Sequence, residues 1–154
     1  MLIKEIMTTE VVTVTTEDSV EKCANILLEN NFSGVPVLDE QDKLVGIITE
    51  GDLIRRASRI KAPPYLEVLG GLIYLGNPQK FVAEIKKAMS LKAGELMTSK
   101  VITAHPEDSV EKAATLMIEN EVRRLPVLDD TGNLAGIVSR RDIMHQLYQN
   151  EHYS

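Results

Sequence analysis

The sequence contains very little cysteine and few aromatic residues. Cys23 is the only cysteine among 154 residues, tryptophan is absent, and aromatic residues make up 4% of the chain. A single cysteine excludes an intrachain disulfide and a thiolate-rich metal site. Because Ala24, Ile26 and Leu27 surround it in the sequence, and because cysteine is among the most buried residue types, we expect Cys23 to be a small core residue.

The chain also lacks an excess of positive charge and a long hydrophobic run. Its 17 basic and 23 acidic residues give a net charge of −6, which excludes a broad positive field for nucleic acid or an anionic membrane. The longest apolar stretch, Tyr65 to Leu75, contains Glu67 and is about half of the roughly 20 residues that span a bilayer, so no membrane insertion is expected. Lys4, Glu5 and Glu10 interrupt the apolar region of an export signal, which favours a cytoplasmic protein.

The most informative feature of the sequence is an internal repeat. Residues 7–52 match residues 97–142 at a constant offset of 90 without a gap. For example, Glu17 to Lys22 (EDSVEK) recurs as Glu107 to Lys112, and Pro36 to Asp39 (PVLD) recurs as Pro126 to Asp129. We therefore divide the chain into a first repeat (1–60), a helical connector (61–92) and a second repeat (93–154).

The residue pattern of each repeat predicts strands and helices in the order β-α-β-β-α. In the first copy, β-branched or apolar runs predict strands at Val11–Val14, Gly34–Leu38 and Leu44–Thr49. In the second copy, the equivalent runs are Val101–Thr103, Leu125–Leu128 and Leu134–Ser139. Apolar residues at helical spacing predict a helix after the first strand, capped by Asp18 in one copy and by Asp108 in the other. A second helix is expected near Asp52 and near Asp142.

This order predicts an α/β fold in which the two repeats depend on each other. A three-stranded sheet covered by helices on one face leaves its other face apolar, so one copy alone would be marginal. We expect the two copies to pack sheet to sheet about a pseudo-twofold axis. Within the connector, Asn77-Pro78 predicts the start of a helix over about Gln79 to Met89.

A hydroxyl and a carboxylate recur at the end of the third strand of each repeat. They are Thr49 with Asp52 in Gly46 to Asp52 (GIITEGD), and Ser139 with Asp142 in the second copy. One interpretation is a plain helix cap that binds the free N–H groups of the following helix. The other is a ribose clamp, in which the carboxylate accepts hydrogen bonds from the ribose hydroxyls beside a phosphate-attracting helix N-terminus.

Basic charge is concentrated in the second repeat. Arg123, Arg124, Arg140 and Arg141 occupy positions where the first repeat has Ser33-Gly34 and Glu50-Gly51. Because arginine holds phosphate in a bidentate manner, these four residues are candidates for an anion clamp. The alternative is a solvated surface paired with nearby acidic residues, which would contribute little to stability.

The segment at the end of the first strand is a candidate for contact with a flat ring. Thr13, Thr15, Thr103 and His105 lie there, and the simpler interpretation is a strand-to-helix turn. The three histidines lack metal-ligand spacing, and the sequence contains no nucleophile elbow or phosphate-cradling glycine loop. We therefore expect no metal site and no enzyme activity.

The repeated motifs closely resemble the cystathionine-β-synthase (CBS) domain. The resemblance rests on Ile6-Met7-Thr8, Gly34 to Asp39 (GVPVLD) and Gly46 to Asp52, with their second-copy matches. A tandem of such repeats resembles a Bateman module. The resemblance implies a regulatory module that binds AMP, ADP or ATP in two clefts, commonly as a homodimer, with an effector protein still unidentified and no prosthetic group.

The resemblance also implies roles for individual residues. Thr49 with Asp52, and Ser139 with Asp142, would bind ribose. Arg123, three positions before a proline, would meet phosphate, and the first copy departs from this pattern with Ser33. We therefore expect the two clefts to differ, one carrying Arg123 and the other Ser33 and Glu50. Whether Arg123 shares a cleft with Asp52 or with Asp142 stays open.

Two alternatives to a nucleotide sensor remain. One is a structural or oligomerisation module whose apolar connector is the working surface. The other is a sensor of a different adenosyl ligand, such as cyclic di-AMP or S-adenosylmethionine.

Overall fold

The first repeat adopts the predicted order of elements. The structure is a computed structural model that describes residues 1–59, 65–74 and 76–149. The elements of this repeat are β1 (Val14–Thr15), α1 (Val20–Asn30), β2 (Gly34–Leu38), β3 (Leu44–Thr49) and α2 (Glu50–Ser58). β1 is parallel to β2, and β2 is antiparallel to β3, which gives one three-stranded sheet.

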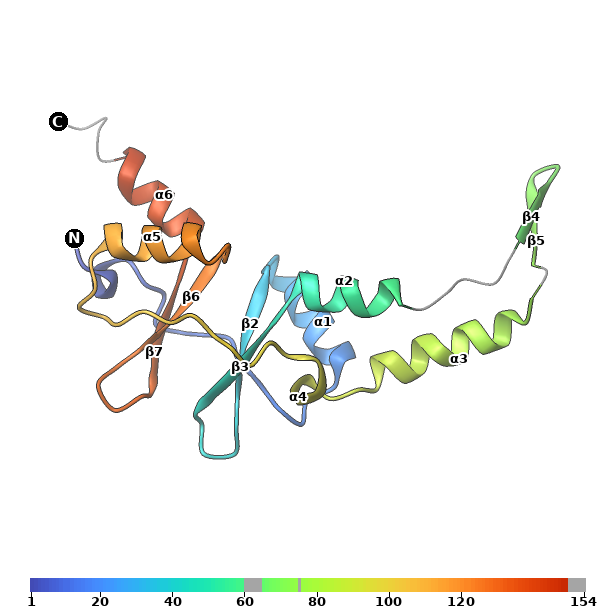
Figure 1. Ribbon diagram of the computed structural model, residues 1–154, viewed down its shortest axis with the longest axis horizontal. Coiled ribbons are helices and arrows are strands. Elements are labelled where there is room, and N and C mark those ends of the chain that lie inside the picture. Colours follow the sequence, from blue (N-terminus) through green and yellow to red (C-terminus); the bar gives the residue numbers. More distant parts are fainter. Residues whose placement is uncertain (60–64, 75, 150–154) are drawn as a thin grey trace.

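The second repeat has the same order. Its elements are α5 (Val110–Glu119), β6 (Arg124–Leu128), β7 (Leu134–Ser139) and α6 (Arg140–Gln149). The counterpart of β1 is a single parallel bridge between Ala104 and Val127. The predicted α/β architecture of two β-α-β-β-α repeats is confirmed, and the two sheets lie next to each other (Figure 1).

The first strand of each repeat is shorter than predicted. Pairing begins at Val14 in the first copy and at Ala104 in the second, so the strands expected over Val11–Val14 and Val101–Thr103 are wrong in extent. The β-branched residues before these points do not pair with a strand. In the second copy two of them, Val101 and Ile102, line a cleft instead.

The caps of α1 and α5 also differ from the prediction. Ser19 is the N-cap residue of α1, and its hydroxyl accepts a hydrogen bond from a backbone N–H within the first turn. Asp18 instead accepts from the backbone N–H of Thr15, in the preceding turn. Ser109 and Asp108 repeat this division of roles in the second copy. Each aspartate therefore closes the strand-to-helix turn, and the serine after it caps the helix.

The N-terminal segment of each repeat packs into the core of the other repeat. Ile3, in the 3-10 helix Ile3–Glu5, is fully buried among second-repeat residues such as Leu125 and Val138. Conversely, Ala93 in α4 (Ala93–Leu96) is fully buried in the core of the first repeat, which also contains Cys23. Figure 1 shows the N-terminal end beside α5 and α4 beside β3. Cys23 is the expected core residue, and its burial raises the pKa of its thiol to about 11.

This exchange is held by backbone pairing across the repeats. Thr8 pairs with Ile137 on β7, and Thr98 pairs with Ile47 on β3. The crossing chain passes so close that a Cβ on Gly46 would lie 3.0 Å from the Thr98 carbonyl and would collide with Met97. Gly136 meets the same obstacle on β7. The glycine that begins each recurring motif is therefore needed for close approach of the backbone.

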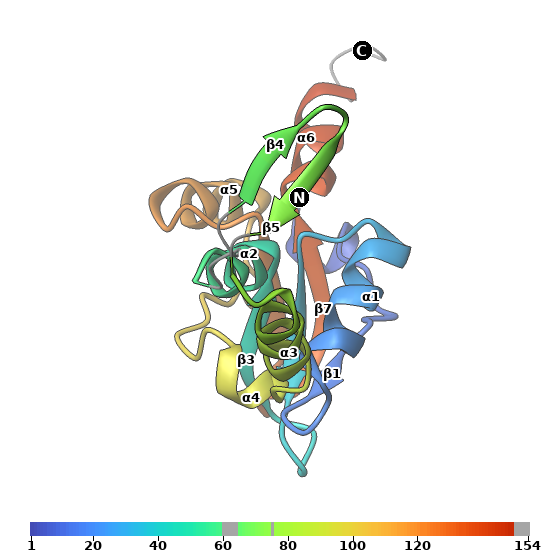
Figure 2. The same ribbon diagram turned by 90° about the vertical axis from the view of Figure 1, so that its right-hand side faces the viewer.

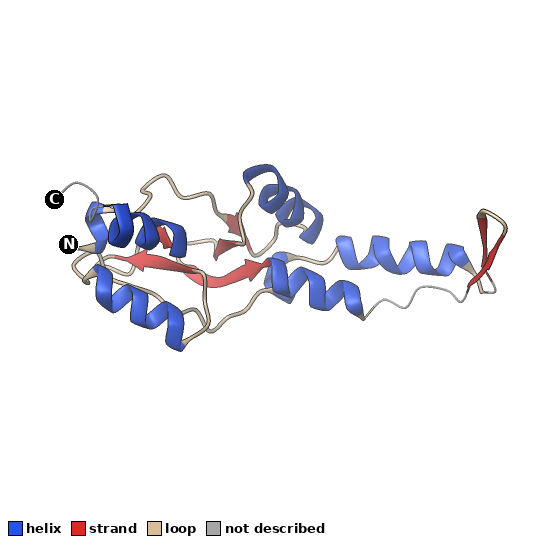
Figure 3. Ribbon diagram, turned by 90° about the horizontal axis from the view of Figure 1, so that it is seen from above, coloured by secondary structure: helices blue, strands red, loops and turns tan. Residues whose placement is uncertain are grey.

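The connector forms an arm at one end of the molecule. It contains a hairpin of β4 (Tyr65–Val68) and β5 (Gly71–Tyr74), followed by α3 (Pro78–Met89). Figure 3 shows the hairpin beyond the end of α3, and Figure 2 shows the same hairpin with α3 seen nearly end-on. The predicted helix is confirmed as α3, with Asn77 as its cap. The hairpin was not predicted. Its turn places Leu69 and Gly70 at positive φ, which glycine adopts readily. Residues 60–64 and 75 of the predicted connector lie outside the described residues.

In the described part of the chain, none of the helices is both long and apolar enough to cross a membrane.

Candidate functional site

A cleft opens between the two repeats where the crossing segment passes the end of β3. Its volume is about 460 Å³, within the range of small-ligand sites. Both repeats contribute to its walls. The lining residues are Ser33, Gly34, Ile47, Thr49, Glu50, Gly51, Ile54, Thr98, Lys100, Val101, Ile102, Glu121, Val122, Arg123 and Arg124.

Thr49 and Asp52 form a reciprocal cap at the start of α2. The Asp52 backbone N–H donates to Thr49 Oγ1 at 3.2 Å, while Asp52 Oδ2 accepts from the Thr49 backbone N–H at 2.9 Å and from its hydroxyl at 3.0 Å. This arrangement is a capping box. The helix-cap interpretation is thus a correct description of the geometry, although Thr49 also lines the cleft.

The other carboxylate oxygen of Asp52 is occupied as well. Asp52 Oδ1 accepts from Arg55 Nη2 at 2.6 Å and from Thr98 Oγ1 at 3.0 Å. Asp52 is only 7% exposed, whereas the side chain of Arg55 is 65% exposed. Asp52 lines a neighbouring cavity with Arg55, Arg56 and Arg59 rather than the cleft itself. Asp52 is therefore buried beside the cleft, behind Thr49, while the side chain of Arg55 approaches it from the solvent side.

Ser139 and Asp142 form a simpler version of this cap on α6. Asp142 Oδ2 accepts from the Ser139 backbone N–H at 2.8 Å, and the Asp142 N–H donates to Ser139 Oγ at 3.2 Å. The 90-residue offset places Thr8 at the position of Thr98 and His145 at the position of Arg55. Among the described residues, neither bonds to Asp142. The two candidate ribose clamps thus differ in how many of their carboxylate oxygens are already bound.

The four candidate arginines do not form one clamp. Arg123 and Arg124 line the same cleft as Thr49, so Arg123 is brought to the motif of the first repeat. Arg140 instead donates to the backbone carbonyls of Val122 (3.0 Å) and Met117 (3.5 Å), because the start of α6 lies beside the end of α5. Arg141 is exposed and is not among the lining residues.

The expected separation of charge between two clefts is also wrong. Ser33 and Glu50 line the same cleft as Arg123, because each cleft takes walls from both repeats. Sequence reasoning missed Lys100, which adds a third positive charge beside Arg123 and Arg124, and it missed the apolar pair Val101 and Ile102. The repeat alignment could have indicated Lys100, because it places this basic residue opposite the acidic Glu10 of the first repeat.

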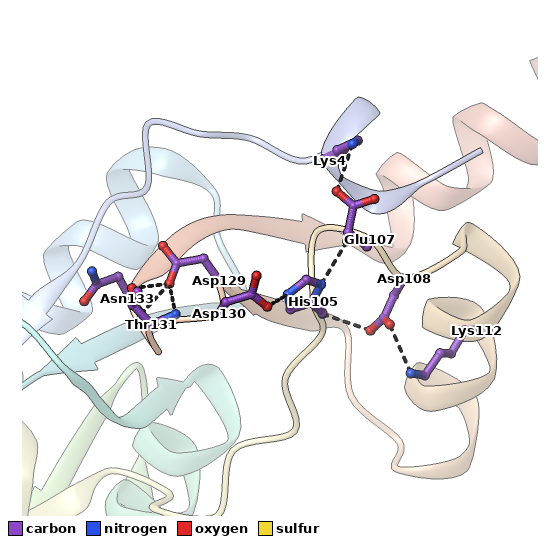
Figure 4. A network of polar contacts seen from close by, with 9 residues as sticks. All are labelled: Lys4, His105, Glu107, Asp108, Lys112, Asp129, Asp130, Thr131 and Asn133. Carbon is purple, nitrogen blue, oxygen red and sulfur yellow. Dashed lines mark hydrogen bonds and ion pairs between the residues drawn. The ribbon is translucent and has the colours of Figure 1, made fainter.

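The candidate ring-binding residues Thr13, Thr15, Thr103 and His105 do not line this cleft. His105 belongs to a polar network at the start of α5 (Figure 4), where its Nε2 lies 2.7 Å from Asp130 and its Nδ1 accepts from the Glu107 N–H. The Nε2 atom therefore carries the proton that Asp130 accepts. Partial burial acts to raise the pKa of Asp108, but hydrogen bonds from the His105 backbone and from Lys112 together outweigh it, so the pKa is lowered. In the described residues, no group of three potential ligands is placed to hold a metal ion.

Comparisons with known proteins agree on the family. A family model of the CBS domain matches residues 3–59 and 93–149. An uncharacterised protein of Methanocaldococcus jannaschii is 37% identical over 154 residues, covering 96% of this chain and 91% of that protein.

Two solved structures resemble this fold over almost its whole length. One is CBSX2 in complex with AMP, a protein of Arabidopsis thaliana, with a TM-score of 0.73, 26% identity, and 97% of this chain and 98% of that chain covered. The other is the CBS domain pair of protein MJ0100 in complex with 5′-methylthioadenosine and S-adenosyl-L-methionine, with a TM-score of 0.72, 27% identity and 98% of both chains covered.

The unequal environments of the two motif aspartates predict unequal effects on stability. Asp142→Ala removes the carboxylate that accepts from the Ser139 N–H and should lower the free energy of unfolding by about 1 kcal/mol. Asp52→Ala removes the equivalent cap and also leaves Thr98 and Arg55 without their acceptor, so its cost should be about 2–3 kcal/mol. Urea unfolding of both variants measures the difference. Equal losses would show that the contacts of Thr98 and Arg55 contribute nothing.

Proposed function

Because this chain belongs to the CBS domain family, we propose that it is a regulatory module that senses AMP, ADP or ATP in the cleft between its repeats. Nucleotide binding would alter its conformation or its contacts with an effector protein. The observation that carries this proposal is the single cleft that combines Thr49 of one repeat with Arg123 of the other. The AMP complex of CBSX2 is consistent with it.

The cleft has basic residues that suit the phosphate of a nucleotide and apolar residues that suit its base. Arg123 and Lys100 supply positive charge for phosphate. Ile47, Val101 and Ile102 supply apolar surface for a flat base.

The ribose would bind at Thr49 and Asp52. For the 2′- and 3′-hydroxyls to donate to Asp52, one of its present donors must leave. Arg55 is the natural choice because its side chain is largely exposed and water can solvate it after it moves. Ligand binding would then exchange an internal ion pair for hydrogen bonds to the ribose, and this exchange is a route by which the start of α2 could respond to the nucleotide.

The charge of the cleft favours a phosphate-bearing ligand over S-adenosylmethionine. The bound ligands of protein MJ0100 carry no phosphate, and S-adenosyl-L-methionine has a cationic sulfonium, which the basic residues of this cleft would repel. Cyclic di-AMP retains phosphates and stays an alternative. A purely structural module would bind none of these ligands.

Calorimetric titration with AMP, ADP, ATP, GMP and S-adenosylmethionine tests this function. Adenine nucleotides should bind and GMP should bind much more weakly. Arg123→Ala should weaken AMP binding about tenfold or more, because a charge-assisted hydrogen bond contributes about 1.5–3 kcal/mol. The variant should also reduce the salt dependence of binding. Arg141→Ala removes the same charge outside the cleft and should leave the affinity unchanged. Absence of binding by all three adenine nucleotides at millimolar concentration would contradict the proposal.

The module would act as a homodimer through the helices of its second repeat. In the first repeat, α3 lies beside α1 and α2, and its residues Phe81, Ile85 and Met89 line an apolar groove there together with Leu53 and Ala24. The corresponding face of α5 and α6 has no such cover among the described residues. On α6, Met144 (59%) and Leu147 (40%), which correspond to the groove residues Ile54 and Ala57, are exposed, and so is their neighbour Tyr148 (63%). An apolar patch of this kind is typical of an interaction surface, and a second copy would cover it by symmetry.

Sedimentation equilibrium measures this association. The parent chain should have twice its monomer mass, and Met144→Glu should shift the equilibrium to monomer, because the new charge would be desolvated at the interface. Val82→Glu, on the outer face of α3, is the matched control and should remain dimeric. A monomeric parent, or a dimer that tolerates Met144→Glu, would contradict the assignment.

A further inference from the structure

The apolar groove between α3 and the helices α1 and α2 has the size of a ligand site. Its volume is about 460 Å³, within the range of small-molecule sites. α3 contacts both α1 and α2, and in the view of Figure 2 it lies between them. Nine apolar residues and one arginine line the groove, and only Ile54 among them also lines the cleft of Thr49. The groove is therefore a place apart from the nucleotide cleft.

The walls of the groove include large apolar side chains that the chain leaves exposed. Ile54 on α2, and Ile85 and Met89 on α3, all line the groove and are all exposed to solvent. Removing apolar surface of this kind from water is favourable. A ligand with a hydrocarbon portion would gain free energy by covering these side chains.

Arg56 is the one charged residue in the lining of the groove. Its Nε atom is buried and has no hydrogen-bond partner among the described residues. A buried donor without an acceptor is costly and uncommon in folded proteins. An anionic group on a ligand would satisfy this nitrogen with a charge-assisted hydrogen bond.

Arg56 also borders the cavity next to Asp52, so it lies where an apolar surface meets a basic one. That cavity is lined by Arg55 and Arg59 as well. Its carboxylates are Glu95 and Asp52, and Asp52 is already bound by Arg55. Three arginines beside two carboxylates leave positive charge at this end of the groove, which favours the anionic group of a ligand there.

The second repeat lacks this combination. Arg56 corresponds to the uncharged Gln146, and the connector that supplies α3 is not repeated. A simpler role for Arg56 is to interact with the C-terminal end of α2, where a positive charge is favourable. That role accounts for the charge but leaves the buried nitrogen without an acceptor.

We infer that the groove is a second ligand site, which binds an amphipathic carboxylate of the medium-chain fatty acid class. The hydrocarbon portion would lie between α3 and α2, and the carboxylate would accept from Arg56. A neutral apolar molecule would leave the Arg56 nitrogen unpaired, and a small free anion would leave the apolar walls exposed. The inference does not depend on nucleotide sensing.

Decanoate is the probe for this site. Calorimetric titration of the full chain should show one decanoate bound per chain. Decan-1-ol has the same hydrocarbon tail without the charge and should bind at least tenfold more weakly. Acetate has the charge without the tail and should show no measurable binding. Absence of decanoate binding, or equal affinity for decanoate and decan-1-ol, would overturn the inference.

Two variants test the location of the bound decanoate. Arg56→Met removes the charge but keeps a long side chain, and it should weaken decanoate binding at least tenfold. Arg141→Met, which removes an exposed charge on α6, is the matched control and should bind like the parent. Ala57→Phe fills the groove without changing the charge and should abolish binding. Thermal melting followed by circular dichroism confirms that each variant is folded. Binding that survives Arg56→Met or Ala57→Phe at full strength would overturn the inference.

Sedimentation equilibrium separates a ligand site from an interface between copies of the chain. Ala57→Phe should have the same mass as the parent, and added decanoate should leave that mass unchanged. Loss of association in Ala57→Phe, or dissociation caused by decanoate, would show that a second copy occupies the groove and would overturn the inference. A failure of AMP to bind would contradict the proposed function and would leave this site untouched.

Discussion

The exchange of segments between the two repeats is the constraint on which the rest of the structure depends. Thr8 pairs with β7 and Thr98 pairs with β3, so the chain entering each repeat first completes the sheet of the other. This pairing carries Ile3 and Ala93 into cores that their own repeats do not form. It also leads the chain from Thr98 along the end of β3 to Ile102, and in this way creates a cleft with walls from both repeats. Separating the repeats would remove both the core contacts and the cleft.

Much of the fold could be predicted because it depends on local patterns. The 90-residue register and the apolar strand patterns predicted β2, β3 and β7 with little error, and Asn77-Pro78 predicted the start of α3. The crossing could not be predicted in the same way. Met7-Thr8 and Met97-Thr98 are identical in sequence, and each could pair with either repeat without changing any local preference. Only the contacts of the folded chain distinguish these pairings. The same contacts explain why glycine is needed at Gly46 and Gly136.

For the candidate site, too, the sequence identified the residue types correctly but not all of their positions in space. Residue types and spacing correctly identified Thr49 and Asp52 as a hydroxyl and a carboxylate that face each other, and the structure adds that Asp52 is already bound by Arg55 and Thr98. The grouping of four arginines failed because nearness in the repeat pattern is not nearness in space. Arg140 is bound to backbone carbonyls at the end of α5. Charge alone therefore could not show which arginines face a ligand.

The location of bound AMP tests the central claim, that the crossing creates a nucleotide site shared by both repeats. A crystal structure of the chain with AMP measures it directly. The account predicts the phosphate beside Arg123, the ribose hydroxyls at Thr49 and Asp52 with Arg55 displaced, and the base against Val101 and Ile102. Density for AMP that contacts only one repeat, or that lies in the groove between α3 and α1, would contradict the account.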